Sequence, residues 1–157
     1  MLRLLLFLPF ILCSQETFIL PDESHHLMHT LNKNIQNAKQ DVYIFTPTLN
    51  DYLLIKSLKA LSKKKIPITI ITQAPISKQN QVLKLSLLKH ISLYVLAAFK
   101  DSETIHGSLV CIDNQELFSL SSDINSKRLK EEYSFAHYQK QHCHKLFKTF
   151  LSRSKTY

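Results

Sequence analysis

The chain has 157 residues, of which 45% are hydrophobic and 20% charged, and its formal net charge is +8. This length fits one domain with a single core, and the composition excludes a disordered or collagen-like protein. The excess of Lys and Arg favours polyanionic partners, such as nucleic acid or an anionic membrane surface, although a basic solvated surface without such a partner is equally ordinary in small proteins.

The N-terminus has the pattern of a secretory signal peptide. Arg3 precedes an apolar run from Leu4 to Leu12, and small and polar residues follow. A run of about nine residues is too short to cross roughly 30 Å of hydrocarbon as a helix, so a transmembrane anchor is less favoured. We expect residues 1–14 to be a signal peptide and residues 15–157 to be an exported domain, periplasmic or secreted. The alternatives are a retained anchor and a buried N-terminal strand.

The next part of the chain alternates apolar runs with amphipathic segments. Residues 16–20, 41–46, 66–72 and 91–96 have the composition of strands. Residues 24–40, 50–65 and 77–90 carry apolar side chains at helical spacing, and Ser24 is the expected N-cap of the first helix. Because these strands are apolar along almost their whole length, they favour a sheet covered on both faces, with right-handed crossovers between parallel strands.

The remaining segments complete a mixed sheet. Residues 104–113 and 116–122 are predicted to form a hairpin, and residues 133–138 a further strand. Residues 126–132 form a short polar helix or turn in this prediction, and the closing helix of residues 139–153 turns its apolar residues inward, namely Leu146, Phe147, Phe150 and Leu151. The predicted fold class is α/β, a mixed β-sheet flanked by helices on both faces. Its central strands are Val42 to Thr46, Ile68 to Thr72 and Leu109 to Asp113.

Cysteine and histidine residues are candidate cross-links and metal ligands. Beyond the leader the cysteines are Cys111 and Cys143, and an exported chain can pair them. Cys111 lies in an apolar run, where cysteine is more often a small buried side chain, so we favour a free thiol over a disulfide. His25 and His29 share a helical face without a third ligand at a suitable spacing, so a solvated helix face is favoured over a metal site.

The chain keeps its only glycine, Gly107, directly after His106. A glycine at a strand start lets another backbone segment or a ligand come close. Asp113 ends the same strand, and small polar residues follow the next one: Ser119, Ser121, Ser122, Asp123 and Asn125. Taken alone, this arrangement is more typical of a structural strand end than of a catalytic site.

In this segment the chain resembles the phospholipase D superfamily, most closely its small secreted bacterial nuclease branch with one motif per chain. The family motif is His-x-Lys, four residues, Asp, six residues, Gly-Ser-x-Asn, and a Glu further on. His106, Asp113 and Ser121 match the His, Asp and Ser of that motif. The Lys, Gly, Asn and Glu positions hold other residues: Ser108, Leu120, Asp123 and Ser134. Residues 31–72 also resemble the opening of the family fold, and residues 120–135 resemble the segment after the motif in cardiolipin synthases.

The resemblance implies a phosphodiesterase that uses no metal or other cofactor. Two motifs meet in a homodimer, where one His attacks phosphorus and the other protonates the leaving oxygen. It implies catalytic roles for His106, Asp113 and Ser121. Ser108 and Asp123 then lie at the substrate, with Lys127 and Arg128 as nearby cations that supply positive charge.

The departures from the motif remove a positive charge, hydrogen-bond donors and a carboxylate that orients the His. Losing one preorganised group of this kind commonly lowers a rate by about 10²- to 10³-fold. We therefore expect a weak or inactive phosphodiesterase that binds a polyanion such as nucleic acid. The alternatives are an active metal-independent phosphodiesterase or endonuclease, with His106 as nucleophile and Lys63, Lys64 and Lys65 among the candidate phosphate contacts, and a phospholipid hydrolase or transferase.

Overall fold

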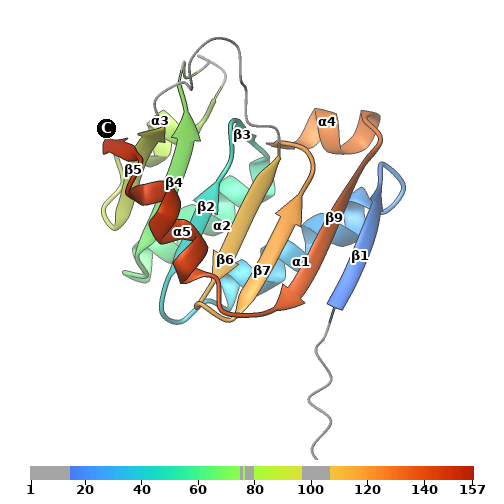
Figure 1. Cartoon of the computed structure of the whole chain (residues 1–157), viewed down its shortest axis with the longest axis horizontal. Coiled ribbons are helices and arrows are strands. Elements are labelled where there is room, and N and C mark those ends of the chain that lie inside the picture. Colours follow the sequence, from blue (N-terminus) through green and yellow to red (C-terminus); the bar gives the residue numbers. More distant parts are fainter. Residues whose placement is uncertain (1–14, 75, 77–79, 97–106) are drawn as a thin grey trace, which may run out of the picture.

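The structure is a computed structural model that describes residues 15–74, 76, 80–96 and 107–157. The predicted signal peptide and His106 lie outside the described residues. The described part is built on an eight-stranded mixed sheet with the order β1-β9-β7-β6-β2-β4-β5-β10 (Figure 1). Its strands are β1 (Gln15–Leu20), β2 (Val42–Phe45), β4 (Ile68–Gln73), β5 (Ile91–Leu96), β6 (Ser108–Ile112), β7 (Glu116–Leu120), β9 (Ser134–Lys140) and β10 (Ser154–Thr156). A separate parallel pair joins β3 (Leu49–Asn50) to β8 (Ile124–Asn125).

Parallel and antiparallel pairing divide the sheet. Strands β2, β4 and β5 run parallel, whereas β6 pairs with β2 antiparallel and continues through β7 and β9 to β1. The three predicted central strands are therefore confirmed, since β6, β2 and β4 stand side by side inside the sheet. The short strand β10 forms the edge of the sheet opposite β1, and it was not predicted.

Helices cover both faces of the sheet, as predicted, but unequally. Helices α1 (Ser24–Gln36) and α2 (Tyr52–Lys63) pack on one face, and α5 (His144–Leu151) lies across β4 and β2 on the other (Figure 1). Short helices α3 (Val82–Leu85) and α4 (Ser126–Glu131) lie at one end. Among the described residues, no helix is long and apolar enough to cross a membrane.

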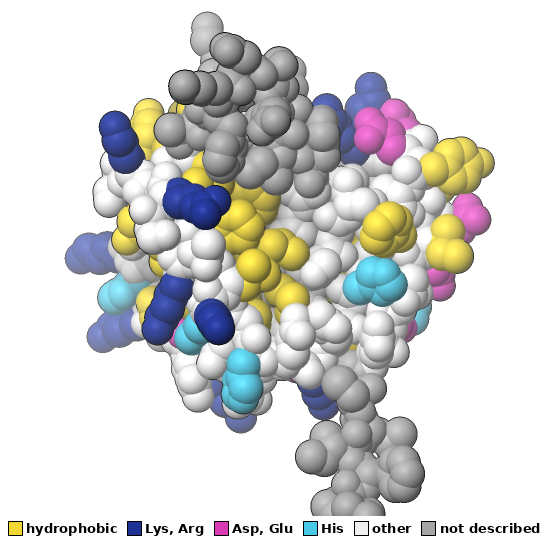
Figure 2. Space-filling view, in the orientation of Figure 1, with side chains coloured by type: hydrophobic (Ala, Val, Ile, Leu, Met, Phe, Trp, Pro, Cys, Tyr) yellow, Lys and Arg dark blue, Asp and Glu magenta, His cyan; other side chains and the backbone are white. Residues whose placement is uncertain are grey.

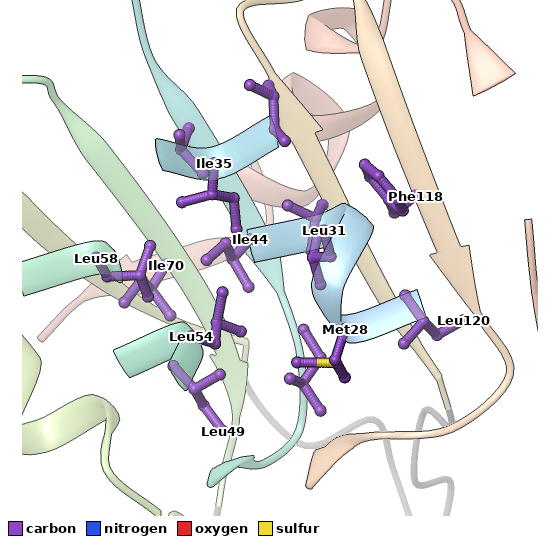
Figure 3. Packing of buried hydrophobic residues seen from close by; sticks show 14 of the residues in the cluster. Met28, Leu31, Ile35, Ile44, Leu49, Leu54, Leu58, Ile70, Phe118 and Leu120 are labelled. Carbon is purple, nitrogen blue, oxygen red and sulfur yellow. The ribbon is translucent and has the colours of Figure 1, made fainter. Parts of the chain in front are cut away.

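The larger core lies between the sheet and the helices α1 and α2. Met28, Leu31 and Ile35 of α1 interdigitate with Leu54 and Leu58 of α2 above the strands (Figure 3). The smaller core lies under α5, where Phe147 packs among side chains of the central strands: Phe45, Ile71, Cys111 and Leu117. Because β2 and β4 are covered on both faces, most of their side chains are apolar.

Three local predictions were wrong for identifiable reasons. Ser24 is the first residue of α1, and Glu23 occupies its N-cap without a side-chain cap. Within the described residues 80–90 of the predicted helix 77–90, only α3 is helical, because the chain tightens into turns after Leu85, where the amide of Leu88 donates to the carbonyl oxygen of Leu85 at 2.9 Å. Leu146 is 40% exposed, since the inward stripe of α5 passes through Phe147 instead.

Cys111 and Cys143 form a disulfide, with their Cα atoms 5.9 Å apart, so the favoured free thiol was wrong. The bond joins the centre of β6 to the N-cap of α5. It therefore holds α5 against the half of the sheet that this helix covers. The even number of cysteines beyond the leader was the sequence signal for it.

Candidate functional site

Gly107 directly precedes β6, at the end of the strand where the phospholipase D-like motif begins. Its φ angle is +102°, and a Cβ at this position would lie 2.6 Å from the carbonyl oxygen of Leu120. Both facts require glycine, because other residues rarely adopt this backbone and the obstacle is itself backbone. The close approach that the glycine permits is thus to the paired strand β7. His106, the residue before it, lies outside the described residues.

Four hydroxyl side chains meet directly beyond Gly107, and we call Thr46, Ser108, Ser122 and Ser134 the hydroxyl cluster. Ser108 donates to Thr46 Oγ1 at 2.8 Å and approaches the carbonyl oxygen of Ser122 at 3.0 Å. Thr46 in turn donates to the carbonyl oxygen of Thr48 at 2.7 Å. The hydroxyls of Ser134 and Ser122 are 3.4 Å apart. The cluster thereby ties the ends of β2, β6, β7 and β9 together.

The hydroxyl cluster brings together the positions at which the phospholipase D motif has its Lys and its Glu. Ser108 occupies the first position and Ser134 the second, and Ser122 contacts both. Ser108 is 1% exposed, so its hydroxyl is committed to these partners. The cluster is uncharged, and it offers a phosphate group no cation of its own.

The charged residues beside the cluster are paired with one another. Asp123 is 6% exposed, and its carboxylate lies 3.2 Å from a guanidinium nitrogen of Arg128. Arg128 also lies 3.6 Å from Glu132, and Lys127 lies 3.9 Å from Glu131. Both predicted cations of the site are therefore offset by carboxylates, although the exposed pairs are weak in water.

Ser121 lies beside the cluster without joining it. Its hydroxyl accepts from the amide of Phe135 at 3.0 Å and lies 3.2 Å from the carbonyl oxygen of the same residue. These contacts close the β7–β9 ladder at its end. Ser121 is exposed, so a group bound at this edge of the sheet can reach it.

Asp113 lies at the opposite end of β6, away from the other predicted site residues. It lies five positions along the chain from Ser108, which is roughly 16 Å at about 3.3 Å per residue of strand. Its carboxylate accepts hydrogen bonds from the backbone amides of residues 39, 40 and 41, at 2.8 to 3.2 Å. Within one chain, this position gives Asp113 the role of fixing the turn before β2 and excludes direct contact with a phosphate at Ser108.

Sequence reasoning missed two residues that shape this edge of the sheet. Thr46 receives the hydroxyl of Ser108, and Asn80 holds the segment after β2 by accepting from Leu49 and donating to the carbonyl oxygen of Pro47. A threonine before Pro47 at a strand end was the signal for the first. Within the described residues, no group of three or more His, Cys, Asp or Glu side chains is placed to hold a metal ion.

Known proteins resemble this chain in sequence and in fold. Residues 31–153 match the family model described as "Cardiolipin synthase, PLD-like domain". A search of curated protein sequences gives no significant match.

Solved structures share the fold at low sequence identity. NucT from Helicobacter pylori aligns with a TM-score of 0.83 and 15% identity, over 92% of this chain and 99% of that one. Nuc from Salmonella typhimurium, a phospholipase D family member, gives a TM-score of 0.74 and 14% identity, over 92% and 98%. TrmBL2, an archaeal chromatin protein with a novel mode of DNA binding, gives 0.62 and 12%, over 95% and 57%.

Proposed function

Because the chain belongs to the phospholipase D-like domain family, we propose that it is an exported member with a degenerate site, which binds a polyanion such as nucleic acid and turns over phosphodiesters weakly or not at all. The observation that carries this proposal is the uncharged hydroxyl cluster. A family enzyme places a lysine ammonium and a glutamate where this chain has Ser108 and Ser134, whose hydroxyls are joined through Ser122.

The loss of charge at the cluster bears directly on the barrier of the reaction. Phosphoryl transfer develops negative charge on the oxygens around phosphorus, and preorganised donors and cations lower that barrier. Arg128 and Lys127 are the nearest predicted substitutes for the lysine, but each already faces a carboxylate. A phosphate at the cluster therefore gains little compensation, and the histidine at position 106 has no glutamate at position 134 to orient it.

Binding of a polyanion requires exposed cations, whereas catalysis also requires preorganised groups at the reacting phosphate. Affinity for a phosphate backbone grows with each exposed cation, because each contact releases condensed counterions. The net charge of +8 supplies such cations, and Lys63, Lys64 and Lys65 are all exposed at the end of α2. TrmBL2 provides a precedent, since the structure that shares this fold is that of a protein described as binding DNA.

A homodimer fits the uncovered half of the sheet. On the face that carries α5, the strands β7, β9 and β1 have no helix over them in the described part of the chain (Figure 1). Ile19 and Phe135 lie opposite each other on β1 and β9, and are 63% and 53% exposed. Figure 2 shows hydrophobic side chains in the middle of this face and others toward its far edge. A second copy packed about a twofold axis would cover both groups.

The test of the proposed function combines retention with turnover. The purified protein is incubated with labelled DNA in the presence of a chelator, and binding and cleavage are followed together over a series of salt concentrations. We expect binding whose logarithm falls linearly with the logarithm of salt, without fragments of the DNA. Absence of binding at low salt would refute polyanion binding, and metal-independent cleavage would refute the degenerate site.

The homodimer is tested separately by light scattering during gel filtration. Replacing Ile19 and Phe135 together by Glu should give a monomer. The matched control is Leu87→Glu, because Leu87 is 86% exposed and lies after α3, away from this face. A monomeric unaltered protein, or equal behaviour of the two variants, would contradict this interface.

A further inference from the structure

The helices α1 and α2 enclose an open groove on the face of the sheet opposite α5 (Figure 1). Its volume is about 380 Å³. The basic side chains that line it are His25, His29 and Lys33 from α1 and Lys56 from α2. The remaining lining residues, among those described, include no Asp or Glu.

The basic side chains of this groove make no polar contacts with other side chains in the described part of the chain. No side-chain hydrogen bond or ion pair joins His25, His29, Lys33 or Lys56 to another residue in the described part of the chain, and all four side chains are exposed. Other histidines do have partners: His26 lies 3.6 Å from Glu16, His137 bonds Thr17 and His144 bonds Asp41. The groove thus gathers basic side chains, and no carboxylate is among its lining residues.

The lining of the groove is mixed. Met28, Leu53 and Ala60 contribute apolar surface, and polar side chains join the two helices. Asn32 is 7% exposed; it donates to the carbonyl oxygen of Met28 at 2.8 Å and accepts from Ser57 at 3.1 Å. Gln36 donates to Ser57 at 3.0 Å. This network joins α1 to α2 along the groove and fixes the separation of the two helices.

The cations are spaced along the groove at regular intervals. His25, His29 and Lys33 follow one another at every fourth residue, which places them about 6 Å apart along the helix axis. Such a row suits a ligand that repeats a negative charge along an extended chain. Lys56 faces this row from the opposite wall, so one chain of phosphates would contact both helices.

A second pocket of about 470 Å³ extends the groove and carries an aromatic side chain. Lys56 lines both pockets, and Lys59 and Tyr52 line the second one. Tyr52 is 75% exposed and therefore offers a free ring face. Basic grooves with exposed aromatic rings are how proteins hold single-stranded nucleic acid, because the bases stack on the rings while the cations follow the backbone.

From these features we propose that the α1–α2 groove binds a single-stranded nucleic acid, with phosphates at His29, Lys33 and Lys56 and a base stacked on Tyr52. This inference rests on the proposed polyanion binding and locates it on the face away from the hydroxyl cluster. The groups that face His25 and His29 are Lys33 on the same helix, Lys56 on α2, and Lys130 and the buried carboxylate of Asp51 in the adjoining pocket.

The test measures fluorescence anisotropy of a labelled oligothymidylate of about 20 nucleotides at several salt concentrations. Replacing Lys33 and Lys56 together by Gln should lower the affinity at least tenfold. It should also reduce the slope of log affinity against log salt by about 1.4, which is about 0.7 for each phosphate that the variant no longer neutralises. The matched control replaces Lys84 and Lys89 by Gln, because both are exposed and lie outside the groove. The control should keep both values.

Stacking is measured in the same assay. Tyr52→Ala should weaken binding about tenfold, and Tyr52→Phe should keep it, because the phenylalanine ring still stacks. If the groove and control variants lose affinity equally, or if the protein binds anionic phospholipid vesicles and not the oligonucleotide, the groove assignment is overturned. If the unaltered protein binds no polyanion at all, the proposed function itself fails.

Discussion

The hydroxyl of Ser108 donates to the hydroxyl of Thr46 at 2.8 Å, across the ends of neighbouring strands β6 and β2. This contact occupies the position at which a family enzyme would extend a lysine toward phosphate. The residue that replaces the lysine is therefore an integral part of the fold, and it is buried. A lysine at position 108 is therefore expected to disturb the packing of the strand ends, whether or not it stabilises a reacting phosphate.

The first prediction concerns that restoration. Ser108→Lys should lower the free energy of unfolding by about 3 kcal/mol or more, because it buries an ammonium group and leaves Thr46 without its donor. It should not restore phosphodiesterase activity, whereas adding Asp123→Asn should give more turnover than either single change. Denaturant unfolding and a reporter assay measure the two effects. Full activity from Ser108→Lys alone would contradict this explanation of the defect.

The second prediction concerns the only glycine of the chain. Gly107→Ala should destabilise the protein by about 2 to 3 kcal/mol, because the methyl group meets the carbonyl oxygen of Leu120 and the backbone angle is unfavourable for alanine. For a domain of this size the melting temperature should fall by roughly 5 to 10 °C. Calorimetry measures the change. A melting temperature equal to that of the unaltered protein would show that the two strands do not approach so closely.

The third prediction concerns the disulfide between Cys111 and Cys143. Their sequence separation of 32 residues corresponds to a loop-closure contribution of about 3 to 4 kcal/mol. Replacing both cysteines by Ala should lower the stability by about that amount, and a reductant should then have no further effect. Mass spectrometry of the oxidised protein after thiol alkylation provides the control. Two alkylated cysteines in the native protein would exclude the bond.

The fourth prediction concerns the buried tyrosines. Burial raises the pKa of Tyr43 above 10.0, with Asp41 and Tyr94 adding to the effect. Burial also raises the pKa of Tyr138, to which the carboxylate of Glu116 contributes. Because the folded protein retains these protons more tightly than the unfolded chain, its stability should be independent of them below about pH 10 and fall above it. Absorbance of tyrosinate should show Tyr43 and Tyr138 ionising above the ordinary pKa of a tyrosine, 10.0.

Glu116 provides the internal check on the tyrosine prediction. Glu116→Gln removes the negative charge beside Tyr138, so the pKa of this phenol should move down toward its ordinary value while that of Tyr43 stays where it was. Tyr138→Phe should flatten part of the loss of stability at high pH. An alkaline titration in which all tyrosines ionise together would show that the pKa values of Tyr43 and Tyr138 are not raised.

The regular part of the fold could be predicted from the sequence, because hydrophobic periodicity reflects which faces are covered. The strands β2, β4 and β6 are apolar on both faces, and the helices α1 and α2 show one apolar stripe each. One failure depends on a long-range contact and another on local turn geometry. The pairing of Cys111 with Cys143 needs α5 to fold back over the sheet, and the shortened helix α3 depends on hydrogen bonds within its own turns.

The candidate site was predicted in part. The motif spacing located Ser108, Ser121 and Asp123 at one end of the sheet, where the structure places them. It also grouped Asp113 with them, although a strand carries that residue to the far end. Spacing along a chain does not reveal the direction in which a strand runs relative to a site, nor that Thr46, distant in sequence, supplies the partner of Ser108.

The central claim is that this domain keeps the family fold without the family's catalytic power. The most direct test is hydrolysis of a phosphodiester reporter in the presence of a chelator, compared between the unaltered protein and His106→Ala. We predict rates that are orders of magnitude below that of a family member with an intact motif, and equal for the two proteins. Robust turnover by the unaltered protein that disappears in His106→Ala would contradict this claim. It would mean that another cation stabilises the negative charge of the phosphate in place of the missing lysine.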